Sequence, residues 1–189
     1  MLRALGSSED SFGQKLFRAV FLVGYYASLR VGEYAVSGVD KHTLRLEDVV
    51  FLEEDGLQSF MLVLNSSKCS NLPAKLVVPA GAEGELCAVS ALKEYLVERG
   101  NMEGLLFKLK SGAPLRARDV NLALRRAAAA AGLDPKGFSG HSLRAGRTTD
   151  LVEMGLADTV IRQSGRWKSD AFLQYVRFDV FRLPGGAPS

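Results

Sequence analysis

The chain has 189 residues, of which 47% are hydrophobic and 24% charged, a length and composition typical of one globular domain with its own core. Its net charge of +3 is too small by itself to indicate a polyanionic partner. No apolar run reaches the roughly 18 residues of a membrane span, and the N-terminus lacks the apolar segment of a secretory signal. Cys69 and Cys87 have neither metal-ligand nor disulfide-framework spacing, so we expect an intracellular protein with reduced thiols and no membrane contact.

The first predicted element is a helix over residues 11–27, because apolar side chains from Phe12 to Phe21 recur at helical spacing. The motif SLRVGEYAV follows, and its Arg30 and Glu33 are three residues apart, as on one side of a further helical turn. Each of these charges is either a surface residue or partly buried among the neighbouring valines and leucines. A partly buried charge would need a partner.

Three short runs rich in β-forming residues come next, VVFLEE, SFMLVLN and AKLVVPA, separated by turn-forming segments. They predict a three-stranded antiparallel sheet between about residues 43 and 79. The second connection, residues 66–73, places Lys68 at or near a hairpin tip. An exposed lysine without a role is the commonest outcome at such a position.

Two more helices are predicted over residues 84–99 and 117–131, with a short extended or buried connector at 105–109 between them. Basic residues are concentrated in this part of the sequence, and the interval 108–126 contains a single acidic residue, Asp119. The basic residues are Lys108, Lys110, Arg116, Arg118, Arg125 and Arg126. Such asymmetry favours a face that contacts DNA or RNA, whereas a solvated helix face is the commoner explanation for a charge run of this size.

Residues 138–177 carry the densest set of reactive side chains. A turn containing proline and glycine predicts the start of a helix there, with His141 and Arg144 three residues apart near its beginning. Both side chains would then reach a single target. A second short helix, over about 158–163, is expected to be closed by Gly165.

A third helix is predicted to begin after Ser169, which has the side chain of a helix N-cap. This helix carries Tyr175, and Trp167 lies just before it in the triplet Gly-Arg-Trp. A tryptophan or a tyrosine alone in such a segment is usually a core residue. The combination of these residues with the earlier motifs is more specific than any one of them.

This constellation resembles the active site of tyrosine recombinases, the phage integrase family. Their pattern is an early Arg, a Lys on a β-hairpin, a His-x-x-Arg box, a His or Trp, and a nucleophilic Tyr. The segments HSLRAG and GRWKSDAFLQYVR are most similar to the enzymes of crypton-like and DIRS-like mobile elements. The matching positions are Arg30, Lys68, His141, Arg144, Trp167 and Tyr175, with Glu33 in support.

The resemblance covers residues 11–178 and implies a mostly helical α+β catalytic domain that contains the small three-stranded antiparallel sheet. Residues 1–10 are then a leader or truncated linker, and residues 179–189 a tail available for contact with a neighbouring subunit. Family enzymes usually begin with a separate helical clamp domain, for which these first residues are too short. The interval from Trp167 to Tyr175 is also shorter than in familiar phage and bacterial members.

The resemblance further implies that Arg30 and Arg144 clamp the oxygens of an attacked DNA phosphate, where negative charge grows in the transition state. Glu33 would orient this site. Lys68 would be the general acid that protonates the leaving 5′-oxygen, and Lys75, on a strand, is a less suitable competitor.

The remaining three residues complete the implied chemistry. His141 would donate to a phosphate oxygen or assist proton transfer, and Trp167 would pack and donate its indole N–H. Tyr175 would be the nucleophile, leaving a 3′-phosphotyrosyl bond and a free 5′-hydroxyl. No ATP, metal ion or other cofactor is required, because the new ester keeps the energy of the broken one.

The implied function is site-specific DNA recombination or integration on double-stranded DNA, by a homotetramer that is a monomer without DNA. The protein would act in the nucleus of a eukaryote, or in the cytoplasm or nucleoid of a bacterium or phage. Three alternatives are kept: relaxation of supercoils as by a type IB topoisomerase, a domesticated inactive DNA-binding module, and a protein-interaction scaffold without salt-sensitive DNA affinity.

Overall fold

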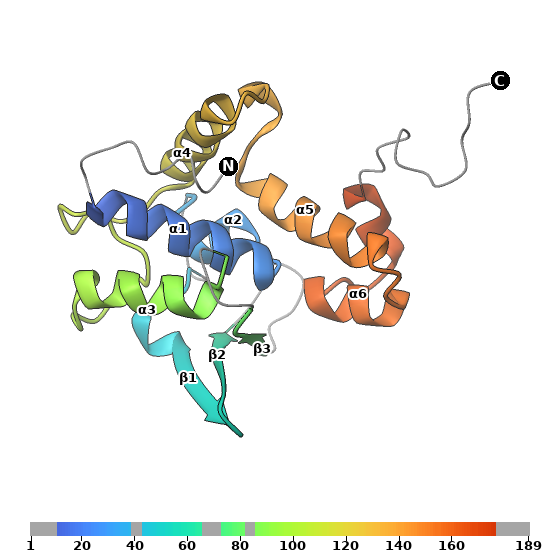
Figure 1. Ribbon diagram of the computed structural model, residues 1–189, viewed down its shortest axis with the longest axis horizontal. Coiled ribbons are helices and arrows are strands. Elements are labelled where there is room, and N and C mark those ends of the chain that lie inside the picture. The colour runs from blue at the N-terminus through green and yellow to red at the C-terminus, as the bar shows by residue number, and fades with distance from the viewer. Residues whose placement is uncertain (1–10, 39–42, 66–72, 82–85, 177–189) are drawn as a thin grey trace.

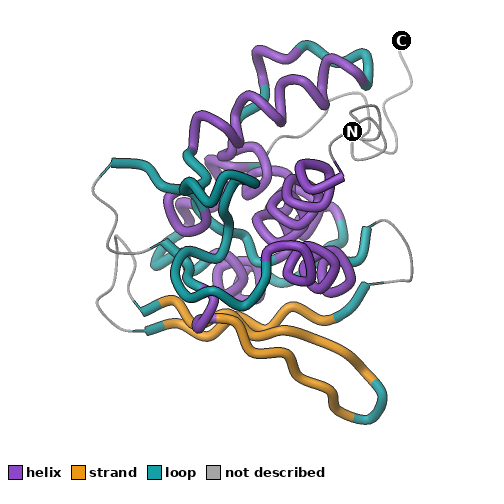
Figure 2. Tube along the Cα trace, turned by 90° about the vertical axis from the view of Figure 1, so that its left-hand side faces the viewer, coloured by secondary structure: helices purple, strands orange, loops and turns teal. Residues whose placement is uncertain are grey.

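The computed structural model describes residues 11–38, 43–65, 73–81 and 86–176. Helices make up most of it, and a small sheet lies as a separate layer beneath them (Figures 1 and 2). This arrangement confirms the predicted α+β fold class. Within the described ranges, no helix is long and apolar enough to cross a membrane.

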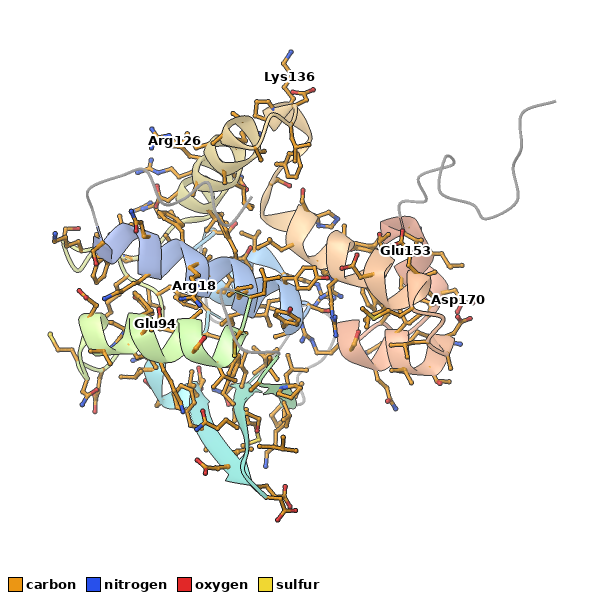
Figure 3. All side chains as sticks on the ribbon, in the orientation of Figure 1. Arg18, Glu94, Arg126, Lys136, Glu153 and Asp170 are labelled. Carbon is orange, nitrogen blue, oxygen red and sulfur yellow. The ribbon has the colours of Figure 1, made fainter. Side chains whose placement is uncertain are left out.

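Helices α1 (Ser11–Tyr26) and α3 (Ala88–Arg99) pack against each other in the main hydrophobic core. The first agrees with the prediction. The second begins later than residue 84, since Cys87 at its N-cap position has extended backbone. Ion pairs also join the two helices, for example Arg18 Nη1 to Glu94 Oε2 at 2.6 Å (Figure 3).

The predicted sheet is confirmed, with strands β1 (Val49–Glu54), β2 (Leu57–Leu64) and β3 (Ala74–Pro79) in the order β1-β2-β3, both pairs antiparallel. Phe60 lies at the centre of the register, opposite Phe51 on one side and Val78 on the other, and is fully buried. Its burial shows which face of the sheet contacts the helices. The connection between β2 and β3 that contains Lys68 lies outside the described residues.

The connector at residues 105–109 is the buried alternative of the prediction: Leu106 and Phe107 are buried at bends in the chain, and Leu106 donates its N–H to the carbonyl of Leu44 at 2.9 Å. The connector is followed by helix α4 (Ala117–Ala130). Gly132, just after the end of this helix, has a left-handed backbone conformation with φ +75°. A glycine there is favoured because other residues adopt positive φ only at a cost.

Four short elements complete the fold. They are α2 (Val31–Tyr34) and the 3₁₀ helices η2 (Leu46–Asp48), η3 (Pro135–Gly137) and η4 (Asp170–Tyr175). The predicted third helix of the 138–177 stretch is therefore a 3₁₀ helix. Ser169 occupies its N-cap position but makes no side-chain capping hydrogen bond.

Helix α5 (Gly140–Glu153) connects two separate apolar clusters. Leu143, in its first half, belongs to the main core. Leu151, in its second half, packs with Ile161 and Phe172 in a small cluster formed with α6 (Asp158–Gly165) and η4. Arg144 lies on α5 between these two leucines, directly after Leu143.

The N-terminus of α5 is fixed by close contacts from two other helices. A Cβ at Gly140 would lie 2.7 Å from Val31 Cγ2 and 2.9 Å from Tyr34 Oη, so a larger residue would push α2 away. Asn121 on α4 accepts the Gly140 N–H at 2.8 Å, and Tyr34 Oη donates to the Gly140 carbonyl at 3.3 Å. These contacts hold α5 in register against α2 and α4.

Candidate active site

Glu33 lies on the short helix α2 and Arg30 directly precedes it, in agreement with the helical turn predicted from their three-residue spacing. Arg30 is at the N-cap position, and its backbone N–H donates to Glu33 Oε2 at 2.7 Å. Its Nη1 lies 3.2 Å from Glu33 Oε1. Glu33 is only 4% exposed, so its carboxylate is a buried charge that requires cationic partners.

The second partner of Glu33 comes from the far end of the chain. Arg166 follows the last residue of α6 and donates from Nη2 to Glu33 Oε2 at 2.6 Å. Its side chain is 12% exposed. The sequence motifs assigned Arg166 no role; the available signal was that a partly buried charge at Arg30 or Glu33 would need a partner, and no partner was named for it.

Arg166 also corrects the predicted end of α6. Its backbone is left-handed, with φ 58° and ψ 41°, whereas Gly165 is the last helical residue. Gly165 is needed for a different reason: a Cβ there would overlap the six-membered ring of Trp167. The glycine permits close packing rather than providing the turn.

Arg144 is 1% exposed, although it carries a charge. Its Nη1 donates to the carbonyl of Ser28 at 2.6 Å, and its Nη2 donates to the carbonyl of Gly165. The side chain therefore connects the segment between α1 and α2 with the end of α6. This contact fixes the guanidinium across the junction of the two apolar clusters.

The electrostatics of this cluster favour an anion. Burial, followed by the charges of Arg30 and Arg166, lowers the pKa of Arg144 to about 10, so it stays cationic at neutral pH. Burial likewise lowers the pKa of Arg166, while Glu33 opposes that shift. Three guanidinium groups and one carboxylate leave a net positive charge, with Arg144 and Glu33 buried and Arg30 and Arg166 partly buried.

Several buried donors in this cluster have no hydrogen-bond partner among the described residues. They are Arg144 Nε, Arg166 Nε and Arg166 Nη1. The hydroxyl oxygen of Ser28 is likewise buried without a partner in the described part of the chain. A buried polar group without a partner costs about 1–3 kcal/mol, so native proteins rarely leave several together. Because several such donors occur together and belong to cationic guanidinium groups, they indicate a site for an anionic ligand with several acceptor oxygens.

Trp167 packs on this cluster. The Arg144 guanidinium carbon lies 4.2 Å from the centre of the indole, a cation–π geometry. The same ring contacts Phe172 with centroids 6.2 Å apart. Trp167 thus supports Arg144 from the side of the small apolar cluster.

Tyr175 is the last residue of η4 and is half-buried. Its ring lies 4.8 Å from the His141 ring and 5.4 Å from the Trp167 ring, centroid to centroid. The Arg144 guanidinium carbon is 5.8 Å from the Tyr175 ring centre. The exposed His141 and the half-buried phenol are therefore at the solvent side of the arginine cluster.

The predicted site residues Arg30, Glu33, His141, Arg144, Trp167 and Tyr175 are thus brought together by the fold from α2, α5 and the segment after α6. Lys68 lies outside the described residues. Lys75 instead lines a separate cavity of about 520 Å³ between β3, the end of α1 and α6. No group of three or more His, Cys, Asp or Glu side chains that could hold a metal ion occurs in the described ranges.

The basic residues predicted to contact DNA lie on α4 and the loop before it. Lys110, Arg116, Arg118, Arg125 and Arg126 are exposed. Lys108 is only partly exposed and donates to the carbonyl of Glu103 at 3.0 Å. Figure 3 shows Arg126 on α4 projecting away from the α1–α3 pair, as does Lys136 on the neighbouring η3.

Gly165→Ala should unfold at a lower temperature, because the added methyl group overlaps the Trp167 ring and such overpacking costs about 1–3 kcal/mol. Trp167 is the only tryptophan, so its fluorescence reports the displacement directly. Gly146→Ala is the matched control, since its Cβ would be an ordinary 3.7 Å from Tyr25 Cε2 within α5. Equal melting temperatures and emission spectra for the two variants would contradict this packing.

Comparison with known proteins agrees with this arrangement. The sequence profile of the phage integrase family matches residues 14–177. An integrase/recombinase XerD homolog of Selenomonas ruminantium is 26% identical over 161 residues, which cover 81% of this chain and 44% of that protein.

Two solved structures show the same fold. XerH site-specific recombinase bound to its difH substrate superposes with a TM-score of 0.71 at 20% identity, covering 94% of this chain and 47% of that one. A λ integrase dimer bound to a core site superposes with a TM-score of 0.61 at 21% identity, covering 92% and 44%. The chain therefore spans less than half the length of these relatives.

Proposed function

This chain belongs to the phage integrase family, and we propose that it is a site-specific tyrosine recombinase or integrase that cleaves and rejoins double-stranded DNA through Tyr175. The observation that carries the proposal is the contact of the Tyr175 ring with His141 and Trp167 beside the buried Arg144, which lies in a cluster with the partly buried Arg30 and Arg166. Such a site offers a nucleophile next to a preformed place for a phosphate.

In this proposal the scissile phosphate binds at the arginine cluster. Arg30 and Arg144 donate hydrogen bonds to its non-bridging oxygens, and Arg144 uses the Nε edge that no described residue occupies. Since the guanidinium groups are already ordered by Glu33, Ser28 and Gly165, they need not reorganise as charge grows on those oxygens. The phosphate is stabilised most in the transition state.

The phenol oxygen of Tyr175 attacks the phosphorus as the bond to the 5′-oxygen breaks. His141 takes the phenol proton, a role that the contact between the two rings supports. Lys68, outside the described residues, gives a proton to the leaving 5′-oxygen. A 3′-phosphotyrosyl bond results, and attack by a second 5′-hydroxyl reverses the step, so the cycle needs no ATP, metal ion or other cofactor.

Trp167 supports Arg144 and Tyr175 through its ring contacts in this mechanism, in addition to the indole hydrogen bond expected from the resemblance. The segment GRWKSDAFLQYVR is most similar to the recombinases of crypton-like and DIRS-like mobile elements. We therefore include a relation to such elements in the proposal. Strand exchange between two duplexes requires a homotetramer on DNA, with a monomer expected in its absence. XerH and λ integrase were both solved bound to DNA, which supports double-stranded DNA as the partner.

The proposal is tested with a pool of duplexes that have randomised cores and a nick just 3′ of the candidate cleavage position. Cleavage in such a duplex releases a short oligonucleotide and leaves the protein covalently trapped. We expect a protease-sensitive adduct joined to a DNA 3′ end, and sequencing of trapped duplexes then names the site. Absence of any adduct across the pool would contradict the enzyme and favour a DNA-binding module.

Plasmids containing the recovered site separate recombination from relaxation. A recombinase exchanges strands between two copies of the site and yields deleted or inverted products. An enzyme resembling a type IB topoisomerase relaxes a supercoiled plasmid and yields no exchanged product. We expect exchange that depends on two sites.

The exposed arginines of α4 are expected to contact DNA phosphates. Replacing Arg118 and Arg126 by Gln should weaken binding and reduce the slope of log affinity against log salt by about 2, since each phosphate contact adds roughly 0.9. Lys15→Gln is the control, because Lys15 on α1 pairs with Glu98. Fluorescence anisotropy over a salt series measures both, and equal slopes for the two proteins would place the DNA elsewhere.

A further inference from the structure

Arg166 is the least expected member of the arginine cluster. It sits at a left-handed backbone position where glycine is favoured, because a side chain there costs roughly 1–2 kcal/mol. Ending α6 therefore does not explain an arginine. Its side chain must contribute something that offsets this cost.

One contribution is the ion pair with Glu33, yet that pair uses only Nη2. Arg166 Nε and Nη1 are buried and have no partner among the described residues. Glu33 also accepts from Arg30 through both its backbone N–H and Nη1. Neutralising one carboxylate therefore does not require a second guanidinium.

The net charge of the cluster also indicates that Arg166 does more than neutralise Glu33. With Arg166, the group formed by Arg30, Arg144, Arg166 and Glu33 carries +2; without it, the group carries +1. A bound phosphodiester has one negative charge, and a pentacoordinate phosphorane approaches two. The third arginine matches the cluster to the more highly charged species, which is the requirement for transition-state stabilisation.

We propose that Arg166 is a third arginine of the phosphate site, which donates from Nε or Nη1 to a non-bridging oxygen of the scissile phosphate while Nη2 holds Glu33. The inference rests on the proposed cleavage of DNA and adds a residue to it. Arg166 is then a catalytic residue, and its left-handed backbone at the end of α6 directs it toward Arg30 and Arg144.

Arg166→Gly is the informative variant, because glycine suits the positive φ and the substitution removes only the side chain. On the duplex recovered in the trapping experiment, its single-turnover cleavage rate should fall about 10²-fold, with DNA affinity changed far less. Arg166→Lys should restore part of the rate by returning the charge. Arg162→Ala, on α6 with its Nη1 3.4 Å from Asp170, is the control and should cleave normally.

A binding cycle then distinguishes contact with the phosphate from an indirect effect. In a Tyr175→Phe background, which binds without cleaving, the scissile phosphate is replaced by an uncharged methylphosphonate. For each protein, the affinity for the methylphosphonate duplex is compared with that for the normal duplex. The loss of affinity should be at least about 5-fold larger for the protein with Arg166 than for the protein with Arg166→Gly, the coupling expected of groups in contact.

The outcomes separate this inference from the function on which it rests. Wild-type protein that forms no adduct overturns the proposed cleavage itself. Wild-type protein that forms the adduct, with Arg166→Gly cleaving equally fast or with no coupling in the binding cycle, leaves the function intact and overturns the role of Arg166.

Discussion

Tyr175→Phe should abolish the covalent DNA adduct, lowering its yield by more than about 10⁴-fold, while DNA binding stays within a few-fold of the wild-type value. The substitution removes only the phenol oxygen, so the ring still contacts His141 and Trp167. Loss of the nucleophile without loss of the ring should leave the melting temperature nearly unchanged. Gel analysis of trapped nicked duplexes measures the adduct, and anisotropy measures binding.

Tyr26→Phe is the matched control for that experiment. Tyr26 is also half-buried and contacts an arginine, Arg147, with the guanidinium carbon 5.4 Å from its ring centre, but it lies at the end of α1. It should form the adduct at the wild-type rate. An adduct that persists in Tyr175→Phe would mean that another residue attacks the DNA.

Arg144→Lys should lower the single-turnover cleavage rate by about 10²–10³-fold, even though the charge is kept. Lysine has one compact ammonium group, so it cannot donate to the carbonyls of Ser28 and Gly165 and also present a planar edge to a phosphate. It would also lose the broad stacking surface on Trp167. Rapid-quench measurement on a nicked duplex gives the rate.

Arg18→Lys controls for the general cost of replacing a partly buried, paired arginine. Arg18 pairs with Glu94 between α1 and α3, outside the candidate site (Figure 3). Its cleavage rate should be unchanged. Thermal denaturation of both variants separates lost chemistry from lost folding, and equal rates for Arg144→Lys and wild type would remove Arg144 from the phosphate site.

Glu33 links the two ends of the chain through its hydrogen bonds. Its carboxylate is shared by Arg30, three residues before it, and Arg166, which lies at the end of α6. Substitutions at any of the three should therefore be non-additive, because removing one partner changes the charge that the others meet. The effect of a single substitution in this cluster therefore reflects the interactions of all three residues rather than the contribution of one.

Local patterns in the sequence predicted most of the secondary structure. The spacing of apolar residues predicted the extent of α1, the alanine run ending at Gly132 predicted that of α4, and the alternation of β-forming runs with turns predicted all three strands. These features depend on neighbours within a few residues, which is why sequence alone identifies them. The start of α3 and the 3₁₀ character of η4 differed, since element ends depend on tertiary contacts.

The sequence by itself also identified which reactive residues to consider, because the chemistry of arginine, histidine and tyrosine is carried by residue type and local spacing. It did not identify Arg166, nor the packing role of Gly165, because both depend on residues far away in the chain. Glu33 and Arg166 meet only after α2 and the end of α6 are placed together across Arg144. Long-range burial decided these pairings: a carboxylate removed from water takes whichever guanidinium the folded chain brings to it.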